Sequence, residues 1–188
     1  MKLKFNKDPF ETISWSLNTY KKPKEVIADI FTNEDVVYCK TLIQSAFSYI
    51  FHIKSSKRFQ DNDLFSLYLR VNSLILVGAY YYNSYKNKVE QKEQVFTEHV
   101  KQNNGLARRA IFMETYADPL YRIYSLFAME DMPYWKSEWS YFVLAAYGKH
   151  KVMDTEIYHA LNYFVHTLID ALHDMFIESN KHNHNPAT

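Results

Sequence analysis

A long apolar stretch in the first half of the chain limits the folds that are open to it. Projected at 3.6 residues per turn, residues 63–86 are apolar on nearly every side, and only Ser66, Ser73 and Ser84 form a narrow polar seam. A helix of this kind has to be surrounded by other elements. The sequence therefore predicts an all-α bundle with a central apolar helix near residues 63–86, in which Gly78 marks the close approach of a neighbouring helix.

The other elements are also predicted to be helices. Three glycines and five prolines are too few for the many tight turns of an all-β fold. Asp8-Pro9-Phe10-Glu11 has the order of a helix start, and Asp154 is placed to cap the last helix. Caps and apolar spacing predict further helical segments at about 9–20, 23–31, 35–54, 89–101, 106–116, 119–130, 133–147 and 155–179. We expect one domain over residues 1–179, with about seven or eight helices, and a flexible tail at 180–188.

Charge and cysteine content indicate which partners and compartments to expect. The formal net charge of +1 does not favour nucleic acid, although separate basic clusters and many tyrosines leave that possibility open. Cys39 is the sole cysteine, so the chain cannot form an internal disulfide and a cytoplasmic location is expected. The N-terminus lacks the apolar core of a secretory signal, and the longest apolar run, Leu74–Tyr82, is well short of the roughly 20 residues that cross a bilayer. We expect no membrane association.

A line of proton-handling side chains lies on the last predicted helix. His159, His166, Asp170 and His173 are spaced seven, four and three residues apart, which places them along one line of an α-helix. The apolar residues of the same helix cluster on the opposite side of the helical wheel. The sequence therefore predicts that the histidine line lies in water or at a contact with a partner, where imidazole could make association depend on pH.

Metal binding is the alternative function of this line. His166 and His173 are roughly 10 Å apart along the helix axis, which is too far for one ion. His166 and Asp170, one turn apart, could share a divalent metal ion if further ligands came from another helix or a second subunit. His159 or His173 could assist. No other cofactor is predicted.

Arg70 is the second candidate site, because it lies inside the apolar central helix. A buried guanidinium needs a carboxylate or other acceptors, and Glu114 is one candidate partner. Arg70 could reach water along the helix or lock two helices together. Alternatively, it could bind an anionic ligand with Asn72, Ser66 and Ser73.

These patterns favour a non-enzymatic cytoplasmic interaction or regulatory protein, which meets a protein partner or another copy of itself through its aromatic and histidine-bearing helical surfaces. The alternative is a helical enzyme or sensor that holds a metal ion or a small ligand on the histidine face of the last helix. No catalytic motif in the sequence supports an enzyme directly.

Overall fold

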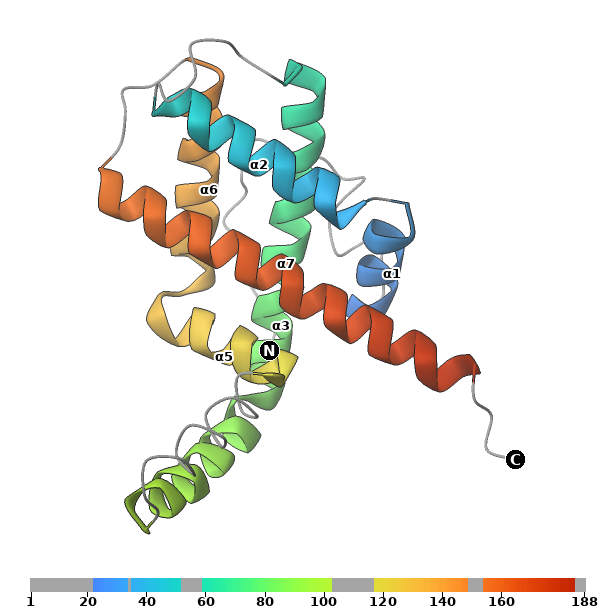
Figure 1. Ribbon diagram of the computed structural model, residues 1–188, viewed down its shortest axis with the longest axis vertical. Coiled ribbons are helices and arrows are strands. Elements are labelled where there is room, and N and C mark those ends of the chain that lie inside the picture. Colours follow the sequence, from blue (N-terminus) through green and yellow to red (C-terminus); the bar gives the residue numbers. More distant parts are fainter. Residues whose placement is uncertain (1–21, 34, 52–58, 103–116, 149–153, 185–188) are drawn as a thin grey trace.

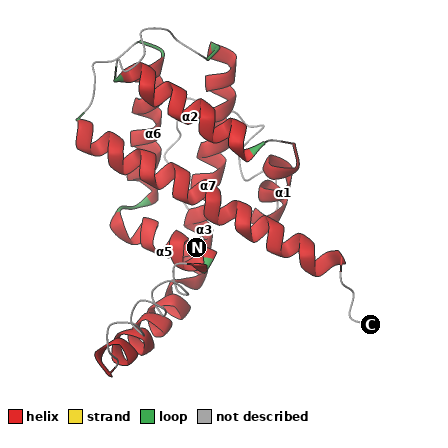
Figure 2. Cartoon of the chain, viewed as in Figure 1, coloured by secondary structure: helices red, strands yellow, loops and turns green. Residues whose placement is uncertain are grey.

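The computed structural model of the protein describes residues 22–33, 35–51, 59–102, 117–148 and 154–184. Within these ranges the chain is all-helical, with six helices and no strand (Figure 2). The helices are α1 (Pro23–Asn33), α2 (Val36–Ile50), α3 (Asp61–Gln102), α5 (Pro119–Met129), α6 (Met132–Ala146) and α7 (Thr155–His184). The helical segments predicted at 9–20 and 106–116 lie outside the described residues. The all-α class is therefore confirmed, whereas the count of seven or eight helices is not.

Aspartate caps begin four of these helices. The carboxylate of each aspartate accepts a hydrogen bond from a backbone N–H in the first turn, where no intrahelical partner exists. The pairs are Asp35 with Val37 at 2.8 Å, Asp118 with Leu120 at 2.9 Å, Asp131 with Tyr134 at 2.9 Å, and Asp154 with Glu156 at 3.0 Å. Prolines in the first turns of α5 and α6 add starts that lose no hydrogen bond. Short local signals thus set the helix starts.

The longest helix, α3, packs against α1, α5, α6 and α7 (Figure 1). Its 42 residues correspond to about 63 Å at 1.5 Å per residue. The sequence predicted two helices here, at 63–86 and 89–101, but the structure has one continuous helix. No glycine or proline interrupts the chain between the two segments, so the change from apolar to charged residues does not end the helix.

One part of α3 has the length and composition of a membrane-crossing helix. Within Asp61–Lys88, an 18-residue window reaches a mean hydropathy of 1.3. However, 67% of that window is buried inside the protein. The apolar character of α3 is therefore accounted for by its packing against four other helices.

The core lies between α3, α6 and α7 and is rich in aromatic rings. Trp135 of α6 stacks on Phe164 of α7, with ring centroids 4.0 Å apart and planes 8° from parallel. Trp139 is fully buried, and its indole N–H donates to the backbone carbonyl of Tyr68 on α3 at 3.3 Å. Phe142 is also fully buried. These three aromatic residues lie on one face of α6, and that face enters the core.

The last helix, α7, contacts all five other described helices. Figure 1 shows it crossing the front of the molecule, with α2 running alongside in the opposite direction. Leu161, Phe164, Leu168 and Leu172 of its predicted core face are fully buried. The helix ends at His184, beyond its predicted end near Ser179. No glycine or proline stands between these two positions to stop it.

Candidate functional site

The predicted line of four polar residues on α7 faces α1 and α2. Phe51, which ends α2, stacks on His159 with ring centroids 6.3 Å apart, and Phe31 of α1 meets His173 edge-on at 5.2 Å. His159 is exposed, whereas the other three residues are half-buried. Part of this face therefore contacts other helices of the same chain, and the predicted contact of the rest with a partner stays a prediction. A helical wheel identifies the apolar face of α7, but it does not predict that other helices pack against the polar face.

Lys40 of α2 joins this line through Asp170. Its ammonium donates to both carboxylate oxygens, at 2.6 and 2.7 Å. The two side chains retain 30% and 43% of their exposure, so water screens the pair and its contribution to stability is modest. The ion pair links α2 to the polar side of α7.

His166, one turn before Asp170, has surroundings that favour its neutral form. Burial is the main cause that lowers the pKa of its imidazole below the ordinary 6.5, and the nearby Lys40 ammonium lowers it further. Asp170 acts in the opposite direction but does not prevail. The Nε2 atom of His166 is buried and has no hydrogen-bond partner among the described residues. A charge on this ring would therefore be poorly stabilised.

The metal hypothesis for His166 and Asp170 stays a prediction. In the part of the chain that the structure describes, no three His, Cys, Asp or Glu side chains are grouped so that they could hold a metal ion. Lys40 already bonds both oxygens of the carboxylate that such an ion would need. A metal ion would have to displace it.

We expect the protein to become less stable as the pH is lowered, because His166 then takes up a proton more readily in the unfolded chain than in the folded one. Its folded-state pKa is lowered, so between the two pKa values the unfolded chain binds more protons, and stability decreases as pH falls below about 6.5. The linked loss is at most ~1.4 kcal/mol per pH unit in that window. Urea unfolding at pH 7.5 and pH 5.5 measures it. His166→Gln should lose less stability over this range than the unmodified protein. His159→Gln, at an exposed position of the same helix, should lose as much as the unmodified protein. Equal losses in all three would contradict the assignment.

The second candidate site is only partly within the described residues. Arg70 and Asn72 are half-buried on α3, whereas Glu114 lies outside the described ranges, so the Arg70–Glu114 pair stays a prediction. The Oδ1 atom of Asn72 is buried without a hydrogen-bond partner in the described part. Ser73 is 3% exposed, and its hydroxyl donates to the carbonyl of Leu69 one turn back, at 3.0 Å. That bond uses the donor that an anionic ligand would need.

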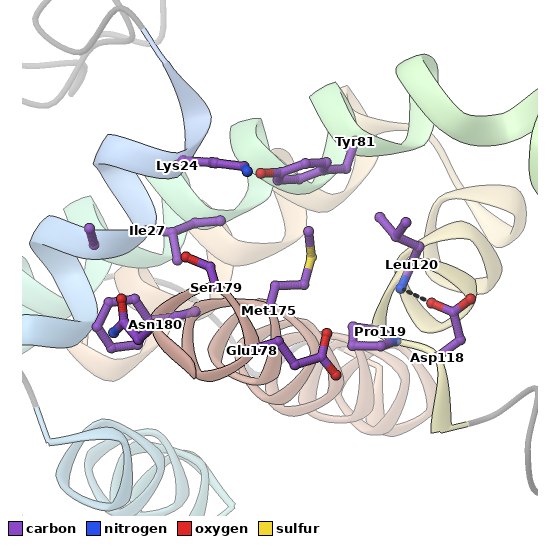
Figure 3. A pocket seen from close by; sticks show the side chains of 12 residues that line it. Lys24, Ile27, Tyr81, Asp118, Pro119, Leu120, Met175, Glu178, Ser179 and Asn180 are labelled. Atoms are coloured by element: carbon purple, nitrogen blue, oxygen red, sulfur yellow. Dashed lines mark hydrogen bonds between the residues drawn. The ribbon is translucent and has the colours of Figure 1, made fainter. Parts of the chain in front are cut away.

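A pocket of about 290 Å³ opens where four helices meet, and its residues were not predicted from the sequence (Figure 3). The helices α1, α3, α5 and α7 supply its walls. Its residues are Lys24, Ile27, Ala28, Tyr81, Asp118, Pro119, Leu120, Met175, Phe176, Glu178, Ser179 and Asn180. The volume is near the lower end of the range of about 300–1,000 Å³ that ligand pockets occupy.

Opposite charges lie on opposite sides of this pocket. Figure 3 shows the ammonium of Lys24 reaching toward the hydroxyl of Tyr81 on one side, and the carboxylates of Glu178 and Asp118 on the other. Met175 projects between the two sides. One oxygen of Asp118 is used by the cap of α5. Lys24 and Glu178 form no ion pair within the described residues.

The hydroxyl of Tyr81 can act as a hydrogen-bond donor in this pocket. Tyr81 is 6% exposed, and burial raises the pKa of its phenol to about 12, with smaller contributions from Tyr85 and Tyr80. The phenol therefore keeps its proton at neutral pH and can donate it to an oxygen of a ligand. The neighbouring Tyr80 is exposed by 46%, so the two adjacent tyrosines have different environments.

The pocket residues lie far apart in the sequence and form no motif. Lys24 belongs to a basic cluster near a helix start, and Tyr81 to a run of tyrosines, both of which have ordinary structural explanations. Comparisons of the chain with models of protein families, with curated proteins and with solved structures found no match. What the pocket can bind is therefore inferred from its own side chains alone.

Proposed function

We propose that this chain is a regulatory protein that binds a small polar molecule in the pocket between α1, α3, α5 and α7. The observation that carries the proposal is the mixed lining of that pocket. Apolar side chains such as Ile27 and Met175 alternate with a few polar groups that can fix a ligand's orientation, as is usual in small-molecule sites. In this proposal the small ligand binds in a different part of the molecule from the histidine line.

The helices around the pocket give ligand binding a route to the rest of the fold. Ile27 of α1 is 3% exposed, and Arg122 of α5 forms an ion pair with Asp174, the α7 residue before Met175. A ligand that touches α1, α5 and α7 together would favour the arrangement in which these helices are docked. Regulation through a ligand-stabilised arrangement follows from that coupling.

A protein partner remains the second candidate function. Val37 and Tyr38, adjacent on α2, are exposed by 69% and 48%. The other large apolar side chains that the described residues expose lie singly on α3, α5, α6 and α7. Scattered apolar residues are common on protein surfaces and need no partner. The pocket is therefore the stronger basis for a function.

A ligand screen with a pocket-filling variant tests the proposal. Small charged and zwitterionic metabolites are added to the protein, and binding is read from the rise in Tm and from NMR chemical-shift changes. A ligand at a hundredfold excess over its Kd stabilises the folded state by about 2.7 kcal/mol. We expect Ser179→Phe, which places a ring in the pocket, to abolish these shifts. The matched control is Ser137→Phe, on the exposed side of α6, which should leave them unchanged.

Two results would overturn the proposal. The first is that no metabolite of the panel shifts the Tm of the unmodified protein. The second is that the shifts persist undiminished in Ser179→Phe, because binding would then occur elsewhere. Circular dichroism of both variants confirms that the helical fold is intact before the shifts are compared.

A further inference from the structure

The separation of charges in the pocket indicates the class of molecule that it takes. A purely anionic ligand bonded to Lys24 would share the pocket with two carboxylates, those of Glu178 and Asp118. A purely cationic ligand near these carboxylates would face the Lys24 ammonium. Like charges at short range oppose binding in both cases. A ligand that carries both charges meets an opposite charge at each end.

Hydrogen-bond donors and acceptors of the pocket are divided between the same two sides as the charges. Lys24 has three N–H donors and Tyr81 has one O–H donor, so this side can bond both oxygens of a carboxylate. Glu178 on the other side is an acceptor only, and it suits an ammonium group. Between the two sides, Ile27 and Met175 offer apolar surface that neither end of such a ligand could use.

We infer that the pocket takes a zwitterion with an apolar side chain, which is an amino-acid-like molecule. Its carboxylate lies against Lys24 and the Tyr81 hydroxyl, its ammonium lies against Glu178, and its apolar part contacts Met175 and Ile27. This inference rests on the proposed function and adds the ligand class to it. The size of the pocket agrees with a small metabolite rather than a drug-sized ligand.

Calorimetric titration with matched compounds tests the ligand class. The probe is L-leucine, and isocaproate and isoamylamine are related molecules that each lack one of its two charges. We expect L-leucine to bind more tightly than either of them, because only L-leucine pairs with both sides of the pocket. Lys24→Met and Glu178→Gln should each weaken L-leucine binding about tenfold or more, the loss expected for one charge-assisted hydrogen bond.

Two control variants separate the pocket from general surface charge. Lys24 and Glu178 are themselves exposed, so the controls are exposed residues of the same kinds: Lys22→Met, two residues from Lys24, and Glu156→Gln on α7. Neither Lys22 nor Glu156 lines the pocket, so both variants should bind L-leucine as the unmodified protein does. Each variant is first shown to unfold at the same urea concentration as the unmodified protein, so that a loss of binding reflects the lost charge.

The remaining outcomes distinguish a wrong ligand class from a wrong function. If isocaproate or isoamylamine binds better than L-leucine and Ser179→Phe abolishes that binding, the zwitterion is overturned and the proposed function survives. If L-leucine binds Lys24→Met and Glu178→Gln as tightly as it binds the unmodified protein, the assignment of its two ends is overturned. If none of the three compounds binds, the ligand class is wrong, and the wider metabolite screen alone decides whether the pocket binds ligands.

Discussion

Trp139→Ala is expected to lower the free energy of unfolding by about 3–5 kcal/mol. Trp139 is fully buried, and its ring lies nearly parallel to Phe142 with centroids 5.1 Å apart. The substitution leaves a cavity between α3 and α6 and removes the hydrogen bond from the indole to the carbonyl of Tyr68. Because small domains are stable by only about 5–15 kcal/mol, this loss would place the protein close to unfolding. Urea unfolding followed by circular dichroism measures it.

The control for this experiment is another aromatic residue on the same helix. Tyr141 is exposed by 47%, so Tyr141→Ala should change the free energy of unfolding by less than about 1 kcal/mol. Trp139→Phe keeps an aromatic ring and should fall between the two alanine variants. Similar losses for Trp139→Ala and Tyr141→Ala would show that Trp139 does not occupy the core position described above.

Gly78→Val is expected to cost about 3 kcal/mol of stability, through overpacking. A Cβ atom at this position would come within 2.7 Å of Cε2 of Phe127 and 2.8 Å of Cδ1 of Leu168. Both neighbours are buried, on α5 and α7, and have little room to move. Gly78→Ala meets the same clash, but alanine favours the helix over glycine by about 1 kcal/mol, which offsets part of the cost. The alanine variant should therefore lose much less stability than the valine variant. Thermal and urea unfolding measure both variants.

A second substitution tests whether contact with Phe127 is the cause. Phe127→Leu removes the ring atoms that a Cβ at residue 78 would meet. Combined with Gly78→Ala, it should therefore destabilise less than the sum of the two single changes, since residues in contact are not additive. Strict additivity would show that α3 and α5 do not approach each other at this glycine.

The helices could be predicted largely from the sequence because their signals are local. Asp154 caps the last helix as expected, and the sole glycine of the central helix lies where a neighbouring helix approaches. The continuity of α3 was missed for a physical reason. A change from apolar to charged residues along the chain indicates the end of a helix, whereas the helix itself continues until the backbone is interrupted or capped.

The candidate site could not be predicted because it depends on how helices are placed relative to one another. Lys24 and Glu178 belong to the first and last described helices, and nothing in their local sequence indicates that they line one pocket. In the same way, a helical wheel places Asp170 on the polar face of α7, but it does not predict that the Lys40 ammonium donates a hydrogen bond to the Asp170 carboxylate. Polar contacts between helices lack the periodicity by which an apolar face is found.

The position of α7 in the chain has a consequence for synthesis of the protein. All five other described helices contact it, yet it is the last of them to be made. At about 5–20 residues per second, the helices before it exist for seconds without their common partner. Large aromatic side chains such as Trp135, which stacks on Phe164 of α7, stay uncovered during that interval. The nascent chain is therefore most open to aggregation and to chaperone binding just before α7 emerges.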